Sequence, residues 1–314
     1  MGRDQKQVIC VLGMHRSGTS LLAGCLNILG LTLGRRENLM SPGADNPTGF
    51  WEHRGIVTVH DHLLADLGLN WHDPSPLPER WTRLPAVAAH RNALRRLCLE
   101  EFGGSRIWAF KDPRVCRLLP LWHALFTELG VTPGFLIAVR NPLEVAESLA
   151  RRNGFKRPKS LLLWLWHNLA AREHTSGYDR VVVEYASLLH HPRSELERIK
   201  YGLRLPNLRE SGDIDKDLAA LLKPELRHQH AANGGDLPET MAQTHALLAE
   251  AANGNARALP LLRSRIASIR SDALRQMATL AQTPAPDTSF LPERGIYRFR
   301  WPPGATARLK PEND

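Results

Sequence analysis

The 314-residue sequence lacks several features that would place it in a class at once. No stretch approaches the run of about 20 apolar residues that crosses a bilayer, so we expect no membrane span. The first residues, MGRDQKQ, lack the apolar block of a signal peptide, and we expect a cytoplasmic protein. The four cysteines are scattered, with no close pair and no metal-ligand spacing, which favours reduced, buried thiols.

Acidic residues are fewer than basic ones. The sequence has 32 Asp and Glu against 41 Lys and Arg, a formal net charge of +9. This excess favours anionic partners without identifying them. Phosphorylated cofactors, acidic glycans and nucleic acid all stay open on charge alone.

Short apolar runs without polar alternation predict parallel strands that are covered on both faces. They lie at 8–12, 107–110, 135–139 and 181–183. Helical patterns lie between them, including 21–29, which Gly30 ends, and the Trp-rich segment 160–174. Strands that alternate with helices predict an α/β fold with a three-layer, P-loop-like core and a mainly parallel sheet.

The sequence also predicts a division of the chain. Strand signals end near Asn207, and an amphipathic pattern rich in Ala, Leu and Arg runs from 238 to 282. We therefore expect a core at 1–206 and a helical C-terminal extension at 207–314 that packs on it. Residues 35–80 are punctuated by Pro, Gly, Asn and Asp, and a loop-rich segment of this length is usually functional or mobile.

The stretch GMHRSGTS, residues 13–20, looks like a phosphate-binding loop without its lysine. In the Walker pattern, glycines let backbone amides surround phosphate and a lysine neutralises the terminal oxygens. Here Thr19 occupies the lysine position, and the cation is Arg16 on the loop itself. A strand, a glycine turn and a helix start still form an anion site. Glu184 is the one weak candidate for holding magnesium. The sequence therefore lacks most of the residues that phosphoryl transfer uses.

A second motif, FLIAVRNPLEVAESLARR at 135–152, predicts a buried strand that ends at Arg140 and then a helix. Asn141 is the expected N-cap, followed by a proline, and Glu144 completes a capping box. Ser148 returns to the face of the cap after about two turns. Arg140 and Ser148 are therefore expected to line one wall of a groove.

The pair of motifs, RSGTS after the first strand and R-N-P-x-x-V-A-x-S after a later one, resembles the bacterial type of PAPS-dependent sulfotransferase. The resemblance extends to NPTGFWEH, FKDPR and VVVEYASLLHHP and covers residues 8 to about 205. It implies that the first motif holds the 5′-phosphosulfate and the second holds the 3′-phosphate. The implied PAPS-binding residues are Gly13, Arg16, Ser17, Gly18, Thr19, Ser20, Arg140 and Ser148, with Arg294 as a remote counterpart of a C-terminal clamp.

The resemblance implies transfer of a sulfuryl group from PAPS to a hydroxyl or amine, which leaves PAP. This group carries a single charge, so Arg16, Lys111 and backbone amides can stabilise it without a metal. Glu52 is the predicted base, because partial desolvation beside Trp51 would raise the pKa of its carboxyl. A cap for the helix that begins near residue 55 is an equally good role for Glu52, and His60 is the next candidate for the base.

Other functions stay open on the sequence. A nucleotide kinase would need magnesium and ATP, and a non-catalytic basic module would bind acidic polymers with a steep salt dependence. We predict a sulfotransferase with a carbohydrate or small-molecule acceptor and no nucleic-acid partner. His60 and His62 point apart on a helix, so no metal site is predicted. For the C-terminal extension we expect an acceptor-side or capping role, with PAP binding retained after truncation before Pro238.

Overall fold

The computed structural model describes residues 6–41, 43, 49–206, 213–222 and 237–282, with side chains as far as residue 275. The chain divides into two compact units, Met1–Met277 and Ala278–Asp314. Of the second unit, only the helix end that reaches Gln282 is described. The following description concerns the first unit.

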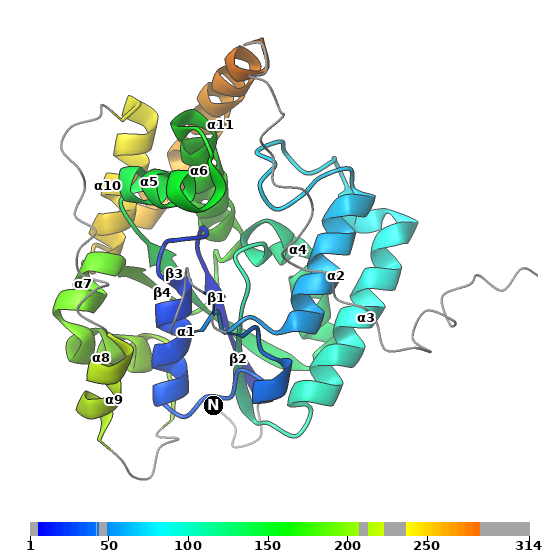
Figure 1. The fold of residues 1–314 in the computed structure, drawn as a ribbon, viewed down its shortest axis with the longest axis vertical. Coiled ribbons are helices and arrows are strands. Elements are labelled where there is room, and N and C mark those ends of the chain that lie inside the picture. Colours follow the sequence, from blue (N-terminus) through cyan, green and yellow to red (C-terminus); the bar gives the residue numbers. More distant parts are fainter. Residues whose placement is uncertain (1–5, 42, 44–48, 207–212, 223–236, 283–314) are drawn as a thin grey trace, which may run out of the picture. The chain divides into compact units, whose positions relative to one another are not determined.

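Parallel strands form a four-stranded sheet in the order β2-β1-β3-β4 (Figure 1). Their bounds are Lys6–Leu12 for β1, Ile107–Lys111 for β2, Val131–Val139 for β3 and Arg180–Glu184 for β4. All four predicted runs are confirmed, and the largest difference is that β3 begins at Val131 rather than at residue 135. Every pairing is parallel, as buried apolar runs without alternation predict.

Helices occupy the connections between the strands and the chain after β4. The α-helices are α1 Thr19–Ile28, α2 Arg54–Asp66, α3 Pro85–Phe102, α4 Val115–Leu129, α5 Pro142–Asn153, α6 Arg157–His174, α7 Tyr185–His190, α8 Pro192–Gly202, α9 Ile214–Leu221, α10 Glu239–Ala252 and α11 Ala258–Gln282. Short 3-10 turns lie at η1, Arg36–Asn38, and η2, Trp81–Arg83. Within its described residues, the segment 35–80 is therefore loop-rich with one α-helix, as predicted.

Two hydrophobic cores lie on opposite faces of the sheet because successive strand residues face opposite ways. Val8, Cys10 and Leu12 of β1 pack with residues of α2 to α6, α10 and α11. Ile9 and Val11 pack with residues of α1, α7, α8 and α9. This arrangement of helices, sheet and helices is the predicted three-layer α/β core (Figure 1).

The strand order places a reversal point of the topology at β1. The chain passes from β1 to β2 on one side, and then from β2 to β3 on the other side of β1. In open α/β sheets, ligands bind at such reversal points, outside the carboxyl ends of the strands. The loop 13–18 leaves β1 at this end, so the fold puts the first motif where ligands bind.

The C-terminal amphipathic pattern forms two helices, α10 and α11. Met241 and Leu248 of α10, with Leu262 and Ile269 of α11, are buried in the same core as α6. These helices therefore contribute to the main hydrophobic core in addition to any role near an acceptor.

This packing changes the result expected for a truncated chain. Ending the chain before Pro238 should lower the free energy of unfolding by several kcal/mol, because each buried Leu or Ile contributes about 1.5 to 3 kcal/mol. Urea unfolding of the two chains would measure the loss. A truncated chain as stable as the full chain would show that α10 and α11 are not part of the cooperative core.

Candidate active site

The loop 13–18 depends on its two glycines. Gly13 has a φ of 138° and Gly18 a φ of 92°. A Cβ on Gly13 would lie 2.7 Å from the Ala138 carbonyl oxygen, and one on Gly18 would lie 2.5 Å from Cδ2 of Tyr185. Gly18 is the N-cap of α1, whose first turn has no acidic residue. The loop thus presents a helix N-terminus that favours an anion.

Ser17 adds a buried hydroxyl to this loop. The residue is 1% exposed, and its Oγ has no hydrogen-bond partner within the described part of the chain. A buried hydroxyl without a partner costs free energy, and an anion held by the loop would accept its hydrogen bond. Thr19, at the position of the missing lysine, is also buried. The loop residues therefore fit a phosphate or phosphosulfate group.

The structure brings the two sequence motifs into contact. Nε of Arg16 donates to Oγ of Ser148 on α5 at 2.9 Å. NH1 of Arg140, which follows β3, donates to the backbone carbonyl of Arg16 at 3.2 Å. Arg16 also has a positive φ of 69°, a conformation that is uncommon outside glycine. Arg16 and Arg140, which are 124 positions apart in the sequence, thus form one cationic group at the loop.

Arg140 has further partners that the sequence did not reveal. Its Nε donates to Glu144 Oε2 at 2.7 Å, and its guanidinium lies 4.2 Å from the centre of the Tyr185 ring. Asn141 caps α5 as predicted, accepting from the backbone N–H of Leu143 at 2.9 Å. The capping-box interpretation of Glu144 missed its ion pair with Arg140. Tyr185 could have been found as the residue that follows β4 at the carboxyl edge.

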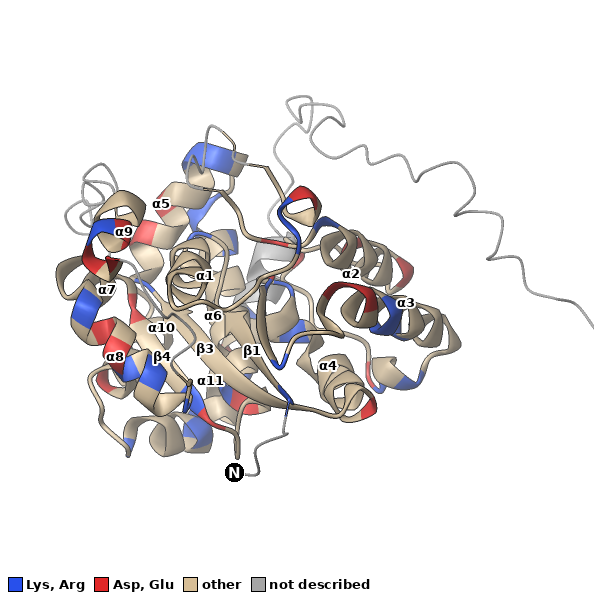
Figure 2. Cartoon of the chain, turned by 90° about the horizontal axis from the view of Figure 1, so that it is seen from below, with Lys and Arg blue, Asp and Glu red and all other residues tan. Residues whose placement is uncertain are grey.

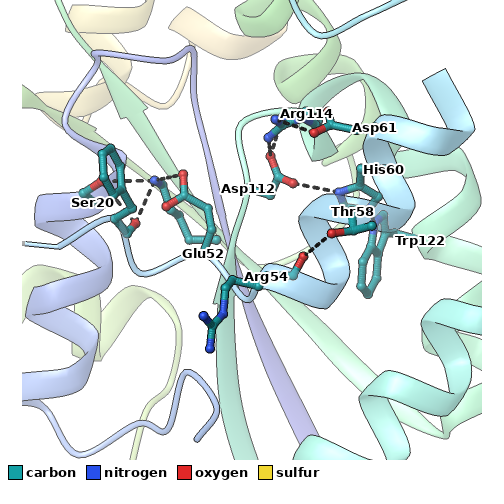
Figure 3. A network of polar contacts seen from close by, with 11 residues as sticks. Ser20, Glu52, Arg54, Thr58, His60, Asp61, Asp112, Arg114 and Trp122 are labelled. Carbon is teal, nitrogen blue, oxygen red and sulfur yellow. Dashed lines mark hydrogen bonds and ion pairs between the residues drawn. The ribbon is translucent and has the colours of Figure 1, made fainter. Parts of the chain in front are cut away.

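A buried ion pair joins Lys111, the last residue of β2, to Glu52, which Figure 3 shows close to Ser20. Nζ of Lys111 is 2.5 Å from Glu52 Oε1 and donates to Ser20 Oγ and the Phe50 carbonyl, both at 3.0 Å. The Lys111 and Glu52 side chains are 3% and 7% exposed. Lys111 is therefore a buried cation that links Ser20, at the start of α1, to Glu52.

Burial acts on both members of this pair. It raises the pKa of Glu52 and lowers that of Lys111, and in each case the attraction between the two groups opposes the shift. Oε2 of Glu52 is buried with no hydrogen-bond partner among the described residues. The carboxyl thus keeps one oxygen available to accept a proton, with a pKa moved toward neutral pH.

Helix α2 is capped by His53 and not by Glu52. Nδ1 of His53 accepts from the backbone N–H of Ile56 at 3.3 Å, and its Nε2 lies 3.3 Å from Glu101 Oε2. The capping role considered for Glu52 is therefore wrong. This observation leaves the carboxyl of Glu52 for the contact with Lys111.

His60 is fully buried, and both of its ring nitrogens are occupied (Figure 3). Nδ1 lies 2.8 Å from Asp112 Oδ2, and Nε2 accepts from the Trp122 indole N–H at 3.0 Å. Because Nε2 is an acceptor here, Nδ1 carries the hydrogen and donates it to Asp112. An imidazole with both nitrogens occupied is poorly placed to take a proton from an acceptor. This geometry favours Glu52 over His60 as the base.

Asp112 organises the segment after β2. Its Oδ1 accepts from the backbone N–H of Arg114 at 3.0 Å and from NH1 of the same residue at 2.9 Å. Burial alone would raise the pKa of Asp112, but Arg114 and His60 outweigh burial and hold it well below its usual range. Arg114 also pairs with Asp61 of α2. This network holds β2 and α2 together beside Lys111.

Some predicted features lie outside these groups. Arg294, the remote clamp candidate, and residues 46–48 of the NPTGFWEH segment fall outside the described residues. Within the described ranges, no cluster of three or more His, Cys, Asp and Glu side chains is arranged to hold a metal ion. No described helix is long and apolar enough to span a membrane.

Charged side chains of both signs are mixed along several helices. Figure 2 shows basic and acidic positions side by side on α3, α8 and α9. On α8, for example, Arg198 pairs with Glu195 and Lys200 with Glu197. Mixed charges do not form the one-sided basic surface that polyanion binding uses. The net positive charge therefore has no matching basic face on these helices.

Comparisons with known proteins give structural likenesses only. No protein-family model and no curated protein matches the chain. The sulfotransferase domain from the curacin biosynthetic pathway shares 16% identity at a TM-score of 0.43, covering 78% of this chain and 98% of that one. The sulfotransferase domain from the Synechococcus PCC 7002 olefin synthase shares 19% identity at a TM-score of 0.41, covering 79% and 95%. Values this low carry no functional assignment.

Proposed function

We propose that the protein is a PAPS-dependent sulfotransferase. The observation that carries this proposal is the contact between the two motifs, in which Arg16 of the phosphate loop bonds Ser148 and Arg140 bonds the backbone of Arg16. A phosphate loop that handles one group needs no second cationic motif, whereas a nucleotide with phosphates on both the 5′ and 3′ positions needs both. A nucleotide kinase, the alternative, leaves the second motif unexplained.

The two motifs divide the nucleotide between them. Gly13 and Gly18 allow the loop backbone to pass close to Ala138 and Tyr185. The N-terminus of α1 and the hydroxyl of Ser17 would hold the 5′-phosphosulfate. Arg140 and Ser148 would hold the 3′-phosphate. Arg16 belongs to the loop and bonds Ser148, so it would contact the 5′-phosphosulfate or the 3′-phosphate.

The residues around Lys111 would carry the chemistry. PAPS, when bound, supplies the sulfuryl group. Lys111 is held by Ser20, in the first turn of α1, and by Glu52, so its charge would be positioned where negative charge develops. Glu52 would take the proton of the acceptor on Oε2, which has no hydrogen-bond partner among the described residues. His60 and Asp112 would act by positioning the strand end that carries Lys111.

The acceptor is proposed to be a hydroxyl or amine of a carbohydrate or small molecule.

The four cysteines are all free and buried, which fits a reducing compartment such as the cytoplasm. The proposed transfer is in line and uses cationic side chains and backbone amides to stabilise the transferred group.

Cofactor choice gives the first test. PAP without magnesium should raise the melting temperature, because it engages both motifs, while ATP with magnesium should do little. Differential scanning fluorimetry with each nucleotide over a concentration series measures this preference. Equal stabilisation by the two ligands would overturn the assignment.

The second motif gives a further test. Arg140→Ala should weaken PAP by about 1.5 to 3 kcal/mol and adenosine 5′-phosphosulfate much less, since only PAP carries the 3′-phosphate. Ser148→Ala should weaken PAP in the same way and also release Arg16. Calorimetric titration of both ligands separates the effects, with Arg151→Ala on the last turn of α5 as the control. If the Arg140 variant loses both ligands equally, the 3′-phosphate assignment is wrong.

A further inference from the structure

A cavity lies between α4, α6, α11 and the segment 75–81, and none of the loop residues 13–18 lines it. Its volume of about 340 Å³ falls within the range of about 300 to 1,000 Å³ that small-molecule sites occupy. Its apolar wall is formed by Leu77, Trp81, Pro120, Ala170 and Leu274. None of these residues takes part in the site described above.

The charged side chains that line this cavity are basic. They are Arg117 and Arg270; the other ionisable side chain, His174, has a pKa lowered by burial, and no described acidic side chain lines the cavity. Arg117 is 8% exposed, and its guanidinium donates to the carbonyls of Asp73 at 2.7 Å and Ser75 at 2.5 Å. Both of these acceptors are neutral. Burial lowers the pKa of Arg117, as expected for a desolvated cation.

Two hydrogen-bond donors in the lining residues have no acceptor within the described part of the chain. Nε1 of Trp166 and Nε of Arg270 are buried, and neither has a partner within the described residues. The Arg270 guanidinium also pairs with Glu173, so its charge is partly balanced. An indole N–H and a guanidinium N–H can only donate. A ligand that satisfies them must therefore present lone pairs.

We propose that this cavity binds a small amphipathic anion, with a carboxylate or similar oxyanion as its head and an aromatic or short aliphatic body. Arg270 and Trp166 donate to the head, and Arg117 supplies positive charge. Trp81, Leu77 and Leu274 pack against the body. This site is separate from the nucleotide loop and does not depend on the proposed sulfotransferase activity.

A matched pair of probes tests the proposal. 2-Naphthoate and 2-naphthamide have the same shape, and only the first is an anion. Isothermal titration of the full chain should show naphthoate binding at least about tenfold tighter than the amide, since charge-assisted hydrogen bonds are worth this factor or more. Binding of the two probes with equal affinity, or no binding of naphthoate up to about 10 mM, would overturn the proposal.

Variants then place the ligand. Arg270→Gln should weaken naphthoate about tenfold, and Trp166→Phe, which keeps a ring but removes the N–H, should weaken it severalfold. Ala170→Met should abolish binding by filling the cavity, and Arg265→Gln on the exposed side of α11 is the control. Arg16→Ala in the phosphate loop should leave naphthoate affinity unchanged. Loss of binding in the Arg16 variant, with binding retained in the Ala170 variant, would place the anion in the loop and reject this site.

Discussion

Replacing Glu52 with Gln should reduce turnover by about two to four orders of magnitude, the usual contribution of a general base. The amide keeps an oxygen that can accept from Lys111 but cannot take a proton from the acceptor. Affinity for PAP should stay nearly unchanged, because Glu52 is not among the residues proposed to hold the nucleotide. Initial rates with labelled PAPS and calorimetric titration with PAP measure the two quantities separately.

Glu100→Gln, on the exposed face of α3, is the matched control and should keep full turnover. Retained turnover in Glu52→Gln together with its loss in His60→Ala would transfer the role of base to the histidine. Because both His60 nitrogens have partners, we expect turnover to be lost in Glu52→Gln rather than in His60→Ala.

The pH profile offers an independent reading of the same residue. Burial raises the pKa of Glu52, and the base acts only when it is deprotonated. Turnover should therefore rise with pH through a pKa above the ordinary carboxyl value. In Glu52→Gln this limb of the profile should disappear. A low-pH limb that is identical in both proteins would assign the titration to another group.

Replacing Lys111 with Met should destabilise the fold by about 3 to 5 kcal/mol, the usual result of removing one partner of a buried ion pair. The carboxyl of Glu52, 7% exposed, would lose the charge that balances it. Its pKa would rise further, so the variant should be least destabilised at low pH and lose stability as pH rises through that pKa. Urea unfolding at several pH values measures the effect.

The double variant Glu52→Gln and Lys111→Met supplies the internal check. It should be less destabilised than Lys111→Met alone, because no buried charge is left unpaired. Lys6→Met, at an exposed cation on β1, should cost little. If Lys111→Met costs no more than Lys6→Met, the pair with Glu52 does not support the fold.

Much of the fold was predictable because its signals are local. The four strands carry uninterrupted apolar runs, and each is buried on both faces. Asn141 and the proline after it mark the start of α5 by their own chemistry. The amphipathic pattern that begins at Pro238 gave no such signal of where it packs, because an amphipathic helix shows that it has a partner without showing which one. Only packing revealed that Leu248 and Leu262 belong to the main core.

The candidate site divides in the same way. By itself the sequence determined the glycine loop, the cation at Arg16 instead of lysine, and the strand that ends at Arg140, because each is a short pattern with its own chemistry. The tertiary structure decided that Arg16 meets Ser148, that Lys111 meets Glu52, and that His53 rather than Glu52 caps α2. Lys111 and Glu52 are 59 residues apart, and such a contact depends on how parallel strands and helices pack. No local pattern encodes that arrangement.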